Sequence, residues 1–246
     1  MEWQDEAIVL TTRRHGETDA IATVLTRDHG RHAGLVKGGA GRRAGPVLQP
    51  GNRVAARWRA RLSEQLGTLQ VEPVHSHAAR LIDDPDRLAA LAAACAVTEA
   101  TLPEREAHPQ AFDGLVELLA ALEAGRGWAV RYVRWERDLL AEIGFGLDLD
   151  HCAATGATED LAWVSPRTGR AVSRVAGQAY ADRLFGLPAF LRMDVDAVDG
   201  DLLAGLRITG HFLDVNVFSP LERMAARDVR GRFVDRIARR ATMGGR

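Results

Sequence analysis

Alternation of apolar and polar residues dominates the first third of the chain. In residues 53–62 (RVAARWRARL) every second residue is apolar, and arginine fills four of the five positions between them. A period of two is typical of a β-strand with one buried face. Short apolar and β-branched runs also stand at 7–13, 20–27, 31–38 and 65–74. Turn-forming residues separate these runs, so the pattern predicts five strands.

The apolar period changes near residue 80, where amphipathic helices are predicted. The segments 109–125 and 128–145 show helical spacing, and each has a glycine at or near its end. A turn-rich segment at about 148–176 interrupts the helices. Five short strands favour a barrel, because closure leaves no exposed sheet edge. We therefore expect an α+β fold with a five-stranded oligonucleotide-binding (OB) barrel in residues 1–79 and a mainly helical domain in residues 80–246.

Composition indicates a globular protein of the cytosol. Apolar residues make up 46% of the chain, yet no run of about 18 uncharged apolar residues predicts a membrane span. The first residues carry acids where a secretory signal would carry lysines. Cys95 and Cys152 are the only cysteines, which gives no disulfide framework and fits a reducing compartment.

The net charge of -1 conceals two strongly basic segments. Residues 27–61 hold nine Arg or Lys and one acid, and residues 223–246 hold eight Arg and two Asp. Such asymmetry indicates an anionic partner. In the C-terminal segment, helical spacing brings four arginines near one another, and whether they form a second basic surface or a solvated helix face stays open. These four are Arg232, Arg236, Arg239 and Arg240.

Three kinds of chemistry are disfavoured by the motifs. The segment 39–44 fits the dinucleotide pattern G-x-G-x-x-A, but the residues after it cannot begin a helix, so no nucleotide cofactor is expected. His75 and His77 are two residues apart, and no C-x-x-C or H-x-x-x-H pair exists, so no metal is expected. The chain has no G-x-S-x-G motif and no evident acid/base pair, so we expect no catalytic residues and no enzyme activity.

The arginines of residues 53–62 fit a nucleic-acid surface. Alternate side chains on one strand face lie roughly 6.6 to 7 Å apart, close to the phosphate spacing of an extended single strand. Guanidinium groups bind phosphate in a bidentate manner. The alternative is an ordinary solvated face, although such faces usually mix charge signs. Trp58 falls on the opposite face and is expected in the core. The predicted nucleic-acid-binding residues are Arg31, Lys37, Arg42, Arg43, Arg57, Arg59 and Arg61.

Several motifs occur in an order that is characteristic of one family. An aliphatic run at 7–10 precedes Gly16-Glu17-Thr18, and a second run leads to Thr26 and Gly30 before the basic glycine-rich segment. Later, IGFGLDLDHC (143–152) and LAWVSPRTGRAV (161–172) follow the same order. Together these segments resemble the RecO family of bacterial recombination mediators, over nearly the whole chain.

The resemblance implies a function in DNA repair and homologous recombination. Members of this family bind single- and double-stranded DNA, anneal complementary strands, and contact RecR and the acidic C-terminal tail of single-stranded DNA-binding protein (SSB), so that RecA can load at SSB-coated gaps. It also implies a cytoplasmic, nucleoid-associated protein without cofactors. The alternatives are a general OB-fold binder of RNA or single-stranded DNA without mediator activity, and a cytosolic enzyme with a basic substrate site.

Many relatives in this family carry a four-cysteine zinc site in the helical domain. Here only Cys152 matches, and Thr155, Ser173 and Ala176 stand where the other cysteines would be. The resemblance therefore does not imply zinc in this chain. We expect the segment 148–176 to keep its shape by hydrogen bonding and packing instead.

Overall fold

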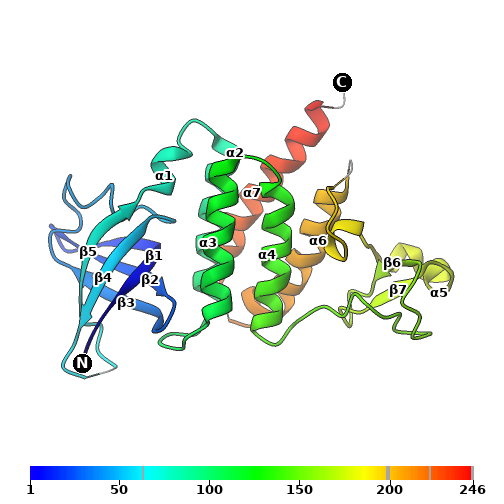
Figure 1. Cartoon of the computed structure of the whole chain (residues 1–246), viewed down its shortest axis with the longest axis horizontal. Helices are drawn as coiled ribbons and strands as arrows, with labels where there is room; N and C mark the ends of the chain where they lie inside the picture. Colours follow the sequence, from blue (N-terminus) through cyan, green and yellow to red (C-terminus); the bar gives the residue numbers. More distant parts are fainter. Residues whose placement is uncertain (63, 198–199, 222, 245–246) are drawn as a thin grey trace. The chain divides into compact units, whose positions relative to one another are not determined.

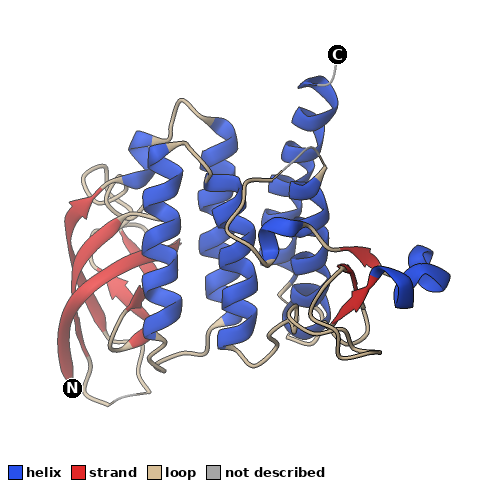
Figure 2. Ribbon diagram, turned by 45° about the vertical axis from the view of Figure 1, so that its right-hand side comes forward, coloured by secondary structure: helices blue, strands red, loops and turns tan. Residues whose placement is uncertain are grey.

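The structure, a computed structural model, describes residues 1–62, 64–197, 200–221 and 223–244, and Figure 1 labels its elements. The chain divides into two compact units. The first is Met1–Gly125 with Asp228–Arg230, and the second is Arg126–Arg227 with Gly231–Arg246. Strands and helices are both present, as Figure 2 shows, so the predicted α+β class is confirmed.

Five strands form the sheet of the first unit. Each strand has two hydrogen-bonded neighbours, because the order is β1-β2-β3-β5-β4 and β4 pairs in turn with β1. All pairings are antiparallel except that of β3 with β5. The five predicted strands are confirmed, although the fourth ends at Arg59 and not at residue 62. The strands are β1 (Glu2–His15), β2 (Asp19–Thr26), β3 (Gly30–Val36), β4 (Arg53–Arg59) and β5 (Thr68–His75).

The alternation along β4 has the predicted burial. Val54, Ala56 and Trp58 are buried, whereas the residues between them are exposed or half-buried. Trp58 is a core residue, as expected, and its indole N–H donates to the Leu66 carbonyl at 3.0 Å. Gly67 fits against this ring, because its φ is +69° and an added Cβ would lie 2.6 Å from the indole.

Three helices follow β5 within the first unit: α1 (His77–Arg80), α2 (Pro85–Thr101) and α3 (Pro109–Ala124). Asp84 caps α2 by accepting hydrogen bonds from two backbone amides, and Pro85 occupies the first turn. The Thr11 hydroxyl of β1 donates to Glu99 of α2 at 2.7 Å. The first unit thus extends through α3, and the predicted boundary near residue 79 stays a prediction.

The second unit is mainly helical, with a small sheet of order β7-β6-β8. Its core includes Tyr132 and Phe233, whose ring centroids lie 4.6 Å apart, and the buried Glu136, which accepts a hydrogen bond from Thr209 at 2.6 Å. None of the helices in the described part of the chain is long and apolar enough to cross a membrane. The elements are α4 (Trp128–Glu142), β6 (Leu161–Val164), β7 (Ala171–Ser173), α5 (Arg174–Gly177), η1 (Gln178–Arg183), β8 (Phe185–Gly186), η2 (Ala189–Leu191), α6 (Asp201–Leu213), η3 (Asp214–Phe218) and α7 (Met224–Gly244).

Hydrogen bonds hold the turn-rich segment around Cys152, as predicted. The Cys152 sulfur accepts a hydrogen bond from the Ser173 amide at 3.2 Å and lies 3.6 Å from the Ser173 hydroxyl. The Thr155 hydroxyl, and then the Ser173 groups, lower the pKa of this thiol to about 6 although it is buried. Of the four positions, only Cys152 offers a usual zinc ligand, so these residues do not fit a four-cysteine zinc site.

Candidate nucleic-acid interface

The exposed faces of β4 and β5 form one polar surface. Arg57 lies opposite Gln70 and Arg59 lies opposite Thr68 in the antiparallel register. Side chains that are directly opposite in a sheet project from the same face. All four residues are exposed. The two arginines therefore stand beside a row of uncharged hydrogen-bonding side chains.

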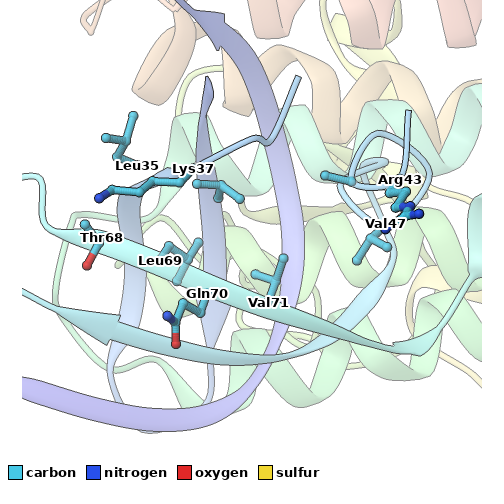
Figure 3. Close-up of a pocket in the computed structure, with 10 residues that line it drawn as sticks. Leu35, Lys37, Arg43, Val47, Thr68, Leu69, Gln70 and Val71 are labelled. Carbon is cyan, nitrogen blue, oxygen red and sulfur yellow. The ribbon is translucent and has the colours of Figure 1, made fainter. Parts of the chain in front are cut away.

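Two pockets adjoin on this surface. Arg57 and Arg59 line a hollow of about 190 Å³ together with Thr68 and Gln70. The same Thr68 and Gln70 also line a larger pocket of about 500 Å³ (Figure 3). Because these two residues of β5 are shared, the pockets lie side by side. The remaining lining of the larger pocket is Leu35, Val36, Lys37, Arg43, Ala44, Val47, Leu69 and Val71.

Four predicted residues thus come together from three places in the sequence. Lys37 follows β3, Arg43 stands in the glycine-rich loop, and Arg57 and Arg59 belong to β4. Figure 3 shows Lys37 and Arg43 with the β5 side chains that line the larger pocket. Arg42 is exposed next to Arg43 in the same loop.

Backbone hydrogen bonds give the glycine-rich loop a defined shape. Gly41 donates to the Gly38 carbonyl and Gly45 to the Gly41 carbonyl, both at 3.0 Å. The loop is also fixed to the β1–β2 turn, because Ala40 donates to the Thr18 carbonyl at 2.9 Å. Successive turns therefore replace the helix that a dinucleotide site would need.

Acidic residues of β1 neutralise part of the arginine face of β4. Arg57 forms an ion pair with Glu2, and Arg53 forms one with Glu6. Because β1 is the neighbour of β4 and its acids project on the same side, the arginine face of β4 adjoins negative charges. Within the described residues, Arg59 has no ion pair or hydrogen bond of its side chain. The same is true of Lys37, Arg42, Arg43 and Arg61.

Three predicted residues line neither pocket: Arg31, Arg42 and Arg61. Arg31 is an internal link, because its side chain is only 11% exposed and its Nε donates to the Leu102 carbonyl at 2.9 Å. It also pairs with Glu104 at 3.4 Å. Arg61 is exposed but lies in the bend after β4, since the strand ends at Arg59. The structure therefore does not bring Arg31 to the surface that the others share.

Sequence reasoning missed two arginines at the end of β1. The sequence pattern ends the first strand at Arg13 and places Arg14 in a turn, but β1 continues to His15 and exposes both side chains. The neighbouring Thr12 hydroxyl donates to the carbonyl of Leu48 at 2.9 Å, which places this end of β1 against the glycine-rich loop. The period-two alternation alone gives no sign that the strand continues past Arg13 or that this end adjoins the loop.

The C-terminal arginines lie on α7 of the second unit. Arg232, Arg239 and Arg240 are exposed, and Arg236 is half-buried. Phe233 and Ile237 occupy the buried side of the same helix. The helical spacing is as expected.

Both parts of the chain match known family models. Residues 1–77 match the model described as "Recombination protein O N terminal", and residues 82–225 match "Recombination protein O C terminal". The chain belongs to the RecO family. The adjoining pockets fall within the N-terminal match, and the segment around Cys152 falls within the C-terminal match.

Similar proteins align with the chain over most of its length. It is 56% identical over 247 residues to the DNA repair protein RecO of Rhodospirillum centenum, covering 100% of this chain and 98% of that protein. It is 54% identical over 224 residues to the DNA repair protein RecO of Phenylobacterium zucineum, covering 91% of this chain and 92% of the relative. The resemblance found in the sequence motifs is thereby confirmed.

Proposed function

We propose that this chain is a DNA-binding recombination mediator. In this role it binds and anneals single-stranded DNA and helps load RecA at SSB-coated gaps during repair. The observation that carries the proposal is the pair of adjoining pockets, in which Lys37, Arg43 and Arg59 offer cations unpaired within the described residues. We also propose that the five-stranded sheet is an OB-type barrel, since each of its strands has two paired neighbours.

The chemistry of the pockets suits contact with phosphates more than contact with bases. No aromatic side chain lines either pocket, whereas leucine, valine and alanine form the apolar part of the larger one. Aromatic rings are the usual stacking platforms for single-stranded bases. Phosphate contacts carry no sequence information and leave the base edges free to pair. Such a surface supports annealing, because it screens the repulsion between two strands without occupying the groups that must pair.

We propose RecR and the acidic tail of SSB as partners. Because the SSB tail is acidic and ends in an apolar residue, its binding site should combine an apolar pocket with a nearby cation. In the second unit, a pocket of about 250 Å³ combines the exposed Phe145 and Val215 with the exposed Arg167, and we propose it as the dock. Titration with a labelled SSB tail peptide tests this, and Arg167→Glu should weaken binding at least tenfold. Equal binding by the variant would exclude this pocket.

Annealing of complementary oligonucleotides coated with SSB tests the proposed function. The variant Lys37→Ala/Arg43→Ala/Arg59→Ala should lose DNA affinity by about a hundredfold at 0.1 M salt, and its salt slope should fall by about 2, since each lost phosphate contact on a single strand removes roughly 0.7. The matched control Arg27→Ala/Arg53→Ala/Arg80→Ala removes the same charge from outside the pockets and should retain most of the affinity. Circular dichroism checks that both variants are folded.

Each outcome separates the mediator from its alternatives. If the pocket variant anneals as well as the wild type, the pockets are not the DNA surface and α7 is the next candidate. If the wild type binds DNA but neither RecR nor the SSB tail, the chain is a general nucleic-acid binder. If the wild type fails to anneal, the mediator proposal is wrong.

A further inference from the structure

Two histidines and a glutamate converge at a place that the DNA-binding proposal does not use. His75 ends β5, His77 begins α1, and Glu123 lies in the last turn of α3. One carboxylate oxygen of Glu123 lies 2.6 Å from His75 Nε2 and 2.6 Å from His77 Nδ1. The three donor atoms lie within 4.8 Å of one another. Two imidazoles and a carboxylate are a common ligand set for zinc and similar transition metals.

The hydrogen bonding of this cluster is incomplete. The side chain of His77 is 6% exposed, and within the described residues neither of its ring nitrogens has a hydrogen-bond partner. The short Nδ1–Oε1 distance therefore lacks the direction of a hydrogen bond. A neutral imidazole carries one nitrogen lone pair that needs a donor or a cation. A metal ion at the point where the three side chains meet would accept that lone pair.

Charges near the cluster act both for and against a metal ion. The Glu123 carboxylate supplies a negative charge beside the two imidazoles. Arg80, 3.9 Å from Glu123, and Arg53, which lowers the pKa of His77, are the nearby cations that oppose a divalent ion.

The dimensions require a small adjustment. Zinc binds nitrogen and oxygen ligands at about 2.0–2.2 Å, so tetrahedral ligand atoms stand about 3.4 Å apart. The two 2.6 Å separations would therefore widen by less than about 1 Å, and the two histidine nitrogens, which lie within 4.8 Å of each other, would approach by up to about 1.4 Å. His75 is 29% exposed, so water can reach the cluster and supply a fourth ligand. The Glu123 backbone is fixed meanwhile, because its carbonyl accepts from Arg87 at 3.2 Å.

We propose that His75, His77 and Glu123 form a binding site for one divalent transition metal of the zinc type, with water completing the coordination. The site connects the β5–α1 junction to the end of α3, so the bound metal cross-links the strand and helix parts of the first unit. Its function is stabilisation of that unit. The sequence motifs give no sign of this site, because Glu123 is far from the two histidines in sequence and no usual ligand spacing is present.

Metal titration of the chelator-stripped full chain tests the site. The wild type should bind one Zn²⁺ with micromolar or tighter affinity in competition with a chromophoric chelator, and Zn²⁺ should raise its melting temperature. Co²⁺ should give the visible absorption of a tetrahedral site, and Mg²⁺ should not bind, because it prefers all-oxygen octahedral sites. His75→Gln and Glu123→Gln should each reduce Zn²⁺ affinity at least tenfold.

The controls keep the test decisive. His151→Gln removes the exposed histidine next to Cys152 and should leave Zn²⁺ binding unchanged. His75 and Glu123 are only partly buried, so these variants report on binding even where replacement of the buried His77 unfolds the chain. Absence of stoichiometric Zn²⁺ binding at 100 μM metal, or equal binding by both variants and the wild type, would overturn the proposal.

Discussion

Removal of the Glu2 carboxylate should strengthen DNA binding. In the structure Glu2 pairs with Arg57, one of the two arginines in the smaller pocket. The substitution Glu2→Gln releases that guanidinium for a phosphate. An exposed ion pair contributes only about 0–1 kcal/mol to stability, so the variant should remain folded.

The expected size follows from the number of available cations. With Lys37, Arg43 and Arg59 unpaired, the wild type should make about three phosphate contacts, which predicts a salt slope of roughly -2.1 for a single strand. A fourth contact through Arg57 should steepen the slope to about -2.8 and tighten binding about fivefold at 0.1 M salt. The gain should shrink as the salt concentration approaches 1 M.

Fluorescence anisotropy of a labelled oligo-dT over a salt series measures both quantities. Glu6→Gln is the matched control, because it removes the same charge from the same strand but releases Arg53, which lines neither pocket. Equal gains by the two variants would show that only net charge matters. No gain by Glu2→Gln would refute the assignment of the β4 face to DNA.

Three further predictions concern stability. Arg31→Ala should lower the unfolding free energy by about 1–3 kcal/mol, since the Leu102 carbonyl loses its donor, and should leave the salt slope of DNA binding unchanged. Burial lowers the pKa of His32 from 6.5 to about 4. The stabilisation that comes from the neutral imidazole is therefore complete above pH 6.5, and the unfolding free energy should fall by up to about 3 kcal/mol as the pH falls towards 4. Urea titrations at several pH values measure this dependence, and His32→Phe should flatten it. Gly67→Ala should cost about 2 kcal/mol or more in urea unfolding, because its Cβ would clash with Trp58, and Gly38→Ala, with φ +67° and open space around it, should cost less. A flat pH profile for the wild type, or equal costs for the two alanines, would contradict the last two.

Features encoded by near neighbours in sequence were predictable. The strands follow from a period of two, and the helices at 109–125 and 128–145 follow from helical spacing with a glycine at or near the end, because both signals act within a few residues. Lys37, Arg43, Arg57 and Arg59 could be proposed for one surface because the charge density of the whole segment was visible. Their common position still depends on β5, whose Thr68 and Gln70 line both pockets.

Features that depend on strand register could not be predicted. Glu2 and Glu6 face the arginines only because β1 pairs with β4, a contact between segments about fifty residues apart. The internal role of Arg31 could not be predicted either. In the sequence it is one basic residue of a strand, and only the fold brings the end of α2 against its side chain. Period-two alternation tells which residues face outward, but not which strand supplies their neighbours.

The burial of Trp58 beneath the arginine face gives the chain a built-in optical probe. Trp58 is buried between the exposed Arg57 and Arg59 of β4. Trp128, Trp135 and Trp163 belong to the second unit. Only Trp3, which stacks on Trp58 at 6.1 Å, shares the first unit with it. Phosphates entering the pockets would change the electric field on this indole pair and shift its emission. Strand capture could then be timed in a stopped-flow instrument on the unlabelled protein.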